Sequence, residues 1–165
     1  MNTETNDVER KRLNDLSARV IGLCIEVHRE TGAGLLESAY EECLAHELNR
    51  NGIRFGRQKE MPLRYKDMLL DCGYRLDFLI EDSLIVELKA VDKVLPIHQA
   101  QLLTYLKLSQ KPLGLLINFN VPMLKDGIQR MTTGDLFREE NKGRSAGWRL
   151  ASLLFASIPC LFGWR

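Results

Sequence analysis

The segment 76–92, LDFLIEDSLIVELKAVD, constrains the fold of this chain more than any other stretch. Its two apolar runs are rich in Leu, Ile and Val and are separated by the polar triplet EDS, a pattern typical of a buried β-hairpin. Charged residues nevertheless interrupt the runs: Asp77, Glu87 and Lys89. Because burying an ionised group in a sheet is costly unless a partner compensates for it, these charges require a physical reason.

The length of the connecting loop decides whether the two acids face each other. A loop formed by residues 81–83 places Asp77 opposite Glu87 and Arg75 opposite Lys89. Period-two alternation then puts all four side chains on one face of the hairpin. A loop shorter by one residue would send the two acids to opposite faces, so the prediction depends on this register.

In the expected register, the two carboxylates require compensation. At about 5 Å and an effective dielectric of about 20, they repel each other by roughly 3 kcal/mol. A divalent cation offsets this directly, because carboxylate oxygens are the ligands that Mg²⁺ accepts, and Lys89 could then orient a water or steady developing charge. Two purely structural explanations of these charges remain. One is a pair of diagonal ion pairs, Asp77 with Lys89 and Glu87 with Arg75, and the other is a solvated face.

The segment 32–42, GAGLLESAYEE, joins two expected helices, 14–31 and 36–51. Its glycines interrupt helical structure, and Glu37 stands in the first turn of the second helix with Tyr40 one turn further on. A glutamate that complements the helix dipole and a tyrosine that packs in the core are the simplest explanation. Their proximity in sequence also allows Glu37 to contribute to an acidic site.

A third helix is expected to begin at Pro96, in the segment PIHQAQLLTYLKLS. His98, Gln101 and Tyr105 share one face of it, which we expect to lie away from the leucine stripe of the same helix. A polar face in contact with solvent would explain this pattern equally well. His98 is expected to be a surface residue or a supporting residue rather than a ligand.

The order of elements predicts an α/β fold with a mixed sheet and flanking helices. Strands are expected at 53–55, in the hairpin and at 112–119, with a short edge strand within 124–131. Residues 1–13 are expected to be a flexible lead-in, 14–137 the folded domain, and 138–165 a charged linker with an apolar tail of unknown role. The apolar part of this tail would span about 22 Å as a helix, which is shorter than the roughly 30 Å hydrocarbon core of a membrane.

Composition excludes some classes of function. The formal net charge is +1, so no global basic field indicates a nucleic-acid-binding protein, although an acidic site can lie beside a basic groove. The 4 cysteines form no CxxC pair, which argues against a zinc ribbon or a disulfide framework. Reduced thiols and the lack of an apolar signal segment at the N-terminus favour a cytoplasmic protein.

Together these motifs resemble a known nuclease family. Gly34, Glu37 and Tyr40 match the signature of the GxxExxY proteins, which belong to the PD-(D/E)xK nuclease superfamily. The pattern D-x9-E-x-K and the pattern Q-x-x-x-Y of that superfamily are matched by Asp77, Glu87, Lys89, Gln101 and Tyr105. The resemblance covers roughly residues 14–133 and implies a restriction-endonuclease-like core, a mixed central β-sheet flanked by helices.

The resemblance implies a metal site and its ligands. Asp77, Glu87 and the backbone carbonyl of Leu88 would hold Mg²⁺, with Mn²⁺ as a substitute, and Glu37 would complete or assist the site. Lys89 would be the catalytic lysine. One departure is that a leucine, not a proline, precedes Asp77, and this residue is not a ligand.

Gln101 and Tyr105 match a motif that, in the related nucleases, supports the site and the nucleic-acid strand. The implied function is a divalent-metal-dependent nuclease that hydrolyses phosphodiester bonds, of DNA rather than RNA. The alternative is a non-catalytic module with a nuclease fold that binds nucleic acid or protein, as a homodimer or in a larger complex. A membrane-associated or scaffold role would depend on the apolar tail, and we do not expect it.

Overall fold

A computed structural model of the chain describes residues 3–70 and 74–137. The main elements are, in order, α1 (Thr3–Thr31), α2 (Glu37–Arg50), β1 (Phe55–Glu60), β2 (Leu63–Tyr65), β3 (Met68–Leu70), β4 (Arg75–Ile80), β5 (Leu84–Lys89), α3 (Pro96–Ser109), β6 (Leu113–Asn118), the 3-10 helix η1 (Leu124–Gly127), β7 (Ile128–Thr132) and the 3-10 helix η2 (Asp135–Phe137). The expected helix after Pro96, the strand within 112–119 and the edge strand within 124–131 are therefore confirmed.

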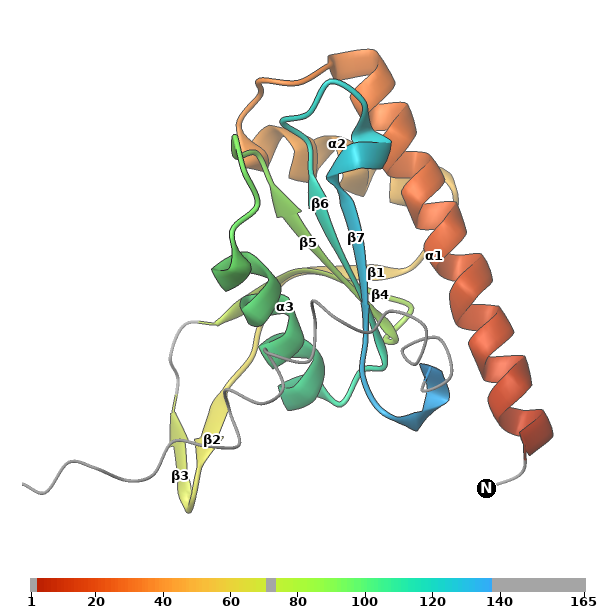
Figure 1. Cartoon of the computed structure of the whole chain (residues 1–165), viewed down its shortest axis with the longest axis vertical. Coiled ribbons are helices and arrows are strands. Elements are labelled where there is room, and N and C mark those ends of the chain that lie inside the picture. The colour runs from red at the N-terminus through yellow and green to blue at the C-terminus, as the bar shows by residue number, and fades with distance from the viewer. Residues whose placement is uncertain (1–2, 71–73, 138–165) are drawn as a thin grey trace, which may run out of the picture.

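The central sheet has five strands in the order β1-β4-β5-β6-β7. Strands β5 and β6 are parallel and are joined by α3, whereas the other neighbouring pairs are antiparallel. Strands β2 and β3 form a separate hairpin that extends from the body of the domain (Figure 1). The fold is α/β with a mixed sheet flanked by helices, as expected.

Each face of the sheet is covered by helices (Figure 1). One apolar cluster joins the sheet to α1 and α2 and includes Tyr40, Phe78 and Phe119. A second cluster joins the opposite face to α3 and includes Leu79, Ile85 and other apolar residues. Since β5 and β6 are buried on both faces, their near-continuous apolar sequence is explained.

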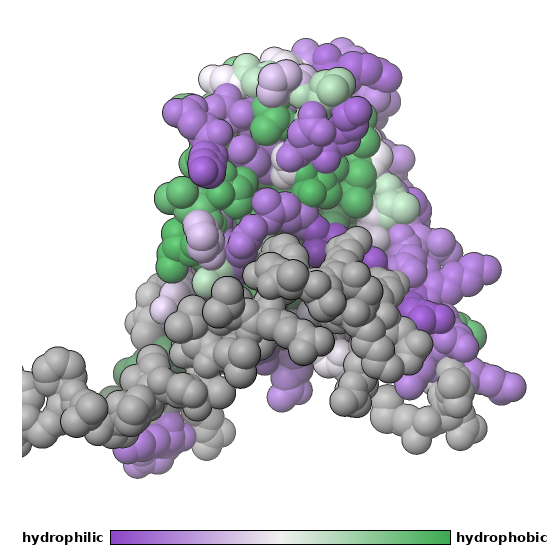
Figure 2. All heavy atoms as spheres, viewed as in Figure 1, coloured by the Kyte–Doolittle hydropathy of each residue, from purple (hydrophilic) through white to green (hydrophobic). Residues whose placement is uncertain are grey.

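Helix α1 begins at Thr3, well before the expected start at Asn14. Leu13 is fully buried, and ion pairs one turn apart stabilise the helix before it: Arg10 with Asp7 and Arg12 with Glu9. The segment expected to be a lead-in is therefore helical from Thr3. Hydrophilic residues line the α1 side of the molecule in Figure 2, as expected for an amphipathic helix.

Helix α2 matches the prediction from residues 36–51 closely. Tyr40, Leu44 and Leu48 are fully buried and form its inner stripe. Leu36 is 77% exposed because it precedes the first helical turn, at the N-cap position. Gly52, with φ 64°, ends the helix in a left-handed conformation that glycine adopts without strain.

The β4–β5 hairpin has the expected three-residue loop, with Ile80 paired to Leu84 and Phe78 paired to Val86. Beyond Phe78, β4 leaves β5 and continues alongside β1 as far as Arg75 (Figure 1). Alternation breaks here, because Leu76 packs in the α3 cluster and Phe78 in the opposite cluster.

The expected placement of Arg75 opposite Lys89 is therefore wrong, since Arg75 pairs with Glu60 of β1, both in the strand register and through an ion pair at 3.7 Å. The cause is the divergence of β4 from β5, which carries Arg75 away from the hairpin. Of the four side chains that were expected on one face, only Asp77, Glu87 and Lys89 remain close together.

No helix in the described part of the chain is long and apolar enough to cross a membrane. The apolar tail lies outside the described residues, so the predictions made for 138–165 are not tested. Cys24 is buried and Cys43 is half-buried, and neither forms a disulfide within the described residues.

Candidate active site

The most deeply buried charged group of the site is Glu87, near the end of β5. Its side chain is 2% exposed, and Lys89 Nζ donates a hydrogen bond to its Oε1 at 2.7 Å. Within residues 3–70 and 74–137, its second oxygen, Oε2, has no hydrogen-bond partner although it is fully buried. Burial, together with the negative charge of Asp77, raises the pKa of Glu87 to about 7.

Asp77 lies where β4 departs from β5. Its side chain reaches across the opening between the two diverging strands to β5. Its Oδ2 accepts a hydrogen bond from the backbone N–H of Leu88 at 2.8 Å. Burial raises the pKa of Asp77, although the Leu88 N–H and the charge of Lys89 act in the opposite direction. The two acids thus come from two diverging strands and are close enough for the charge of Asp77 to raise the pKa of Glu87. The expected strand pairing of Asp77 with Glu87 does not form, because the register of β4 with β5 ends at Phe78 and Val86.

Lys89 lies between two carboxylates, because its Nζ is 2.7 Å from Glu87 Oε1 and 3.9 Å from Glu37 Oε1. Burial alone would lower the pKa of this lysine. The charges of Glu87, Glu37 and Asp77 outweigh that effect and raise it above its ordinary value. The ammonium group therefore stays charged although its side chain is only 13% exposed.

Glu37 is the first residue of α2, and its carboxylate accepts a hydrogen bond from the backbone of Ala90, directly after β5. Its side chain is 44% exposed. Burial raises its pKa, and the negative charges of Asp77 and Glu41 add to this, against the opposing charge of Lys89. The helix start therefore brings a third acid next to Lys89.

The loop before α2 is held by Tyr40. The Tyr40 hydroxyl donates to the carbonyl of Gly32 at 2.8 Å and accepts from the N–H of Leu35 at 3.1 Å. Its ring stacks on Phe119 with centroids 4.3 Å apart. Gly34 has φ 96°, which only glycine adopts readily, so the loop can turn at this residue. This turn and the hydrogen bonds of Tyr40 together position Glu37 at the start of α2.

Gln101 and Tyr105 come from α3, on the other side of the sheet from α2. Gln101 Nε2 donates to the Tyr105 hydroxyl at 2.7 Å. Tyr105 is 3% exposed and packs with Leu102 and Leu106, so the expectation that it lies away from the leucine stripe is wrong. Burial raises the pKa of its hydroxyl, and the charges of Glu87 and Asp77 act in the same direction, which places Tyr105 within electrostatic reach of the site.

His98 does not contribute to this group. Its Nδ1 accepts a hydrogen bond from the backbone N–H of Leu95 at 3.2 Å, which caps the first turn of α3. The expectation of a supporting rather than a ligating role is in agreement with this contact.

Two side chains of β1 join the site without any signal in the sequence. Arg57 Nε and Gln58 Nε2 donate to the two oxygens of Glu41, each at 3.0 Å. Gln58 also lies near enough to Asp77 to lower the pKa of that carboxyl. The expected strand at 53–55 lay too early in the chain to include either residue.

Asn118, at the end of β6, fixes the chain directly after the site. Its Oδ1 accepts from Val91 N at 3.0 Å and its Nδ2 donates to Val91 O at 2.8 Å. Asn118 is 2% exposed and is the partner of Lys89 in the parallel register. The polar residue in the apolar run LGLLIN was the only available signal of this contact.

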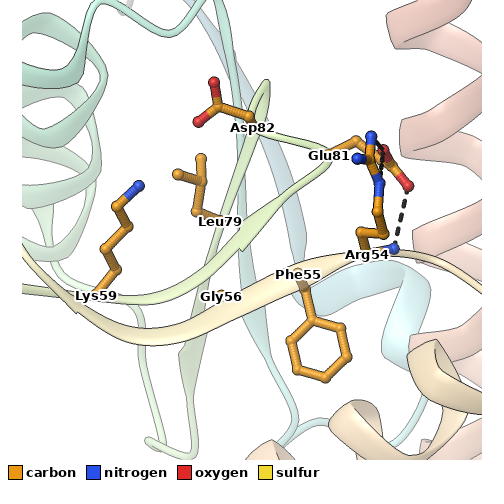
Figure 3. Close-up of a pocket in the computed structure, with 7 residues that line it drawn as sticks. All are labelled: Arg54, Phe55, Gly56, Lys59, Leu79, Glu81 and Asp82. Carbon is orange, nitrogen blue, oxygen red and sulfur yellow. Dashed lines mark hydrogen bonds and ion pairs between the residues drawn. The ribbon is translucent and has the colours of Figure 1, made fainter.

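A pocket of about 240 Å³ lies at the opposite end of the β4–β5 hairpin (Figure 3). Arg54 and Glu81, which line it, form an ion pair at 2.7 Å. None of the candidate site residues lines this pocket, so we do not assign the chemistry to it.

The donor atoms of the site fit a hard divalent cation. Carboxylate oxygens are the preferred ligands of such ions, and the buried Oε2 of Glu87 has no hydrogen-bond partner in the described part of the chain. Within the residues that the structure describes, no three His, Cys, Asp or Glu side chains are close enough together to form a complete cation site. The ammonium of Lys89 separates Glu87 from Glu37 in this arrangement.

The model of the PD-(D/E)XK nuclease superfamily matches residues 14–131 of the chain. The chain belongs to this superfamily. The matched range contains every candidate residue from Glu37 to Tyr105, and the mixed sheet flanked by helices is consistent with a restriction-endonuclease-like core. Membership supports a nuclease-type function, and nucleases of this superfamily generally use divalent metals. No curated protein and no solved structure matches the chain significantly.

Proposed function

We propose that the protein is a divalent-metal-dependent nuclease of the GxxExxY branch that hydrolyses phosphodiester bonds, with DNA preferred over RNA. The observation that carries the proposal is the buried Glu87 carboxyl with one unpartnered oxygen, beside Asp77 and in contact with Lys89. The ion pair with Lys89 engages Oε1 and leaves the buried Oε2 without a hydrogen-bond partner, which costs stability, so a ligand role for this oxygen accounts for what the ion pair does not.

In this proposal, Asp77, Glu87 and the backbone carbonyl of Leu88 hold Mg²⁺, which Mn²⁺ can replace, and Glu37 completes the site. The cation supplies a Lewis acid that polarises the phosphoryl group. The raised pKa values of the three acids indicate surroundings that favour a bound positive charge. Because the pKa of Glu87 is about 7, a cation that binds this carboxylate displaces a proton near neutral pH.

Lys89 has the role of the catalytic lysine. Its pKa is raised, so it remains an ammonium at neutral pH and acts as a hydrogen-bond donor rather than as a base. It orients the attacking water and stabilises the charge that develops on the phosphoryl oxygens. Tyr105, held by Gln101, supports the site and the nucleic-acid strand from the α3 side.

The test is cleavage of double- and single-stranded DNA and of RNA with Mg²⁺, with Mn²⁺ and with a chelator. Lys89→Met is expected to lower the rate by about 10²–10³, because it removes a donor to the transition state. Asp77→Asn and Glu87→Gln should each abolish metal-dependent cleavage. Asp82→Asn is the matched control, because this aspartate is 78% exposed in the turn of the same hairpin.

Metal-dependent cleavage that survives both Lys89→Met and Glu87→Gln would overturn the site. A wild-type protein that cleaves none of the substrates and binds no Mn²⁺ in calorimetry would instead favour the non-catalytic binding module.

The proposal places the activity in the cytoplasm, where free thiols such as Cys24 and Cys43 are maintained. A homodimer or a larger complex is compatible with it, and sedimentation measurements with and without DNA distinguish these assemblies from a monomer.

A further inference from the structure

Strand β1 contains a residue in an unusual backbone conformation directly opposite Asp77. Gln58 has φ 47°, in the left-handed region. Its neighbours are in regular register with β4, Arg57 with Phe78 and Lys59 with Leu76. A non-glycine residue in this conformation costs roughly 1–2 kcal/mol, so glycine would be the less costly choice at this position.

The left-handed conformation changes the direction of the Gln58 side chain. In a regular strand, consecutive side chains point to opposite faces of the sheet. Arg57 and Gln58 are consecutive, yet both donate to the same carboxylate, that of Glu41, at 3.0 Å each. The backbone turn at Gln58 therefore brings its amide to the side of the sheet where Glu41 lies.

The amide of Gln58 links two acids. It donates to Glu41 Oε2 at 3.0 Å, and it lies near enough to Asp77 to lower the pKa of that carboxyl. Glu41 is itself fixed, because Arg57 binds its other oxygen and also binds Glu42 at 2.6 Å. Strand β1, helix α2 and strand β4 are thus connected through one side chain that touches a candidate cation ligand.

We propose that Gln58 is a positioning residue that holds the Asp77 carboxylate against the N–H of Leu88, in the orientation that a divalent cation requires. The cation itself rests on the proposed function. The backbone strain at Gln58 is explained by this role, because glycine would relieve the strain and lose the amide that lies between Glu41 and Asp77.

The first measurement needs no metal. Gln58→Gly removes the amide, and amide hydrogen exchange at Leu88 is expected to accelerate about fivefold or more, because the Asp77 carboxylate that binds this N–H is less ordered. Gln110→Gly is the matched control: Gln110 has φ 55° at the end of α3, so the same relief of strain occurs away from Asp77. It should leave Leu88 exchange unchanged.

The second measurement is calorimetry with Mn²⁺. Gln58→Gly is expected to weaken Mn²⁺ binding by about 10–100-fold, the usual effect of removing a residue that orients a ligand. Gln58→Asn keeps the amide and tolerates a left-handed backbone, so it should restore part of the affinity. Gln110→Gly should bind Mn²⁺ as the wild type does.

The outcomes separate this inference from the proposed function. If Gln58→Gly changes neither Leu88 exchange nor Mn²⁺ affinity, the positioning role is overturned. If Leu88 exchange responds but the wild-type protein binds no Mn²⁺, the hold on Asp77 stands and the metal-dependent function is overturned.

Discussion

Glu87 lies on a strand that is covered on both faces, and this burial couples its protonation to the stability of the fold. Its pKa rises from an ordinary 4.5 to about 7, first because of burial and second because of the charge of Asp77. Between these two values the folded protein binds more protons than the unfolded chain. The stabilisation is therefore fully present below the ordinary pKa and is lost as the pH rises through about 7.

We expect the metal-free protein to lose about 3 kcal/mol of unfolding free energy from this group between about pH 5 and about pH 8. Glu87→Gln cannot ionise and should remove most of this pH dependence. Urea denaturation in the presence of a chelator, repeated across that range for both proteins, measures the difference.

Surface acids do not contribute to the expected loss of stability in this pH range. Glu9, Glu42 and Glu81 have pKa values lowered by arginine partners, so the stability that they provide is lost only as the pH falls below their ordinary range. Equal slopes for the wild type and Glu87→Gln between about pH 5 and about pH 8 would show that Glu87 is not the titrating group.

At the scale of single residues, the sequence predicts those site residues that stand out from their surroundings. Asp77, Glu87 and Lys89 are conspicuous because they interrupt apolar strands. Gln58 could not be found in this way, because it lies in a polar segment and its importance depends on a left-handed backbone that no local pattern indicates. Only contacts between segments distant in sequence, such as its hydrogen bond with Glu41, indicate a role for Gln58.

At the scale of elements, the loop and first turn of α2 work as one unit. Tyr40, one turn after Glu37, reaches back to bind the loop at Gly32 and Leu35. The motif spacing therefore has a structural basis: glycine permits the turn, the glutamate begins the helix, and the tyrosine fixes both. Tyr40 contacts no described acid of the site, so its effect on catalysis must act through the position of Glu37.

Tyr40→Phe is expected to keep the stacking on Phe119 and to lose both hydrogen bonds of the hydroxyl. Unfolding free energy should fall by about 1–2 kcal/mol, because the partly buried N–H of Leu35 and carbonyl of Gly32 lose their partner. The rate of DNA cleavage should also fall. Denaturation and cleavage assays on the same preparation measure both effects.

A double variant with Glu37→Gln identifies the route of the effect. If Tyr40 acts by placing Glu37, the losses of activity should not multiply, whereas the losses of stability should be additive. Activity losses that multiply in the double variant would mean that Tyr40 affects catalysis independently of Glu37.

Elements could be predicted from sequence where one interaction dominates. The polar triplet at 81–83 predicts the three-residue loop of the β4–β5 hairpin, and Pro96 predicts the start of α3. The early start of α1 and the divergence of β4 from β5 could not be predicted, because they depend on burial of Leu13 and on pairing with β1.

At the scale of the whole molecule, the site draws its side chains from four elements of the domain. Glu37 comes from α2, Asp77 from β4, Glu87 and Lys89 from β5, and Tyr105 from α3. Two of these elements, β4 and β5, diverge at the site, and like charges collect in the opening. A cation bound there would hold the two strands together and neutralise the acids at once.

Divalent cations are therefore expected to stabilise the fold at about pH 8, where Glu87 is ionised. At a cation concentration about 100 times the dissociation constant, the gain is about 2.7 kcal/mol. For a chain of this size, such a gain raises the Tm by about 5–10 °C. The shift should be smaller at about pH 5.5, because protons on the raised carboxyls compete with the cation.

Thermal unfolding with Mg²⁺, with Mn²⁺ and with a chelator measures this shift. Asp77→Asn combined with Glu87→Gln should abolish it, because both proposed side-chain ligands in the opening lose their charge. Asp82→Asn should retain it, since this exposed aspartate at the turn is bound to Lys111 at 3.1 Å. A cation-induced shift of the same size in the double variant would mean that the ion binds elsewhere on the molecule, and that the opening between β4 and β5 is not a metal site.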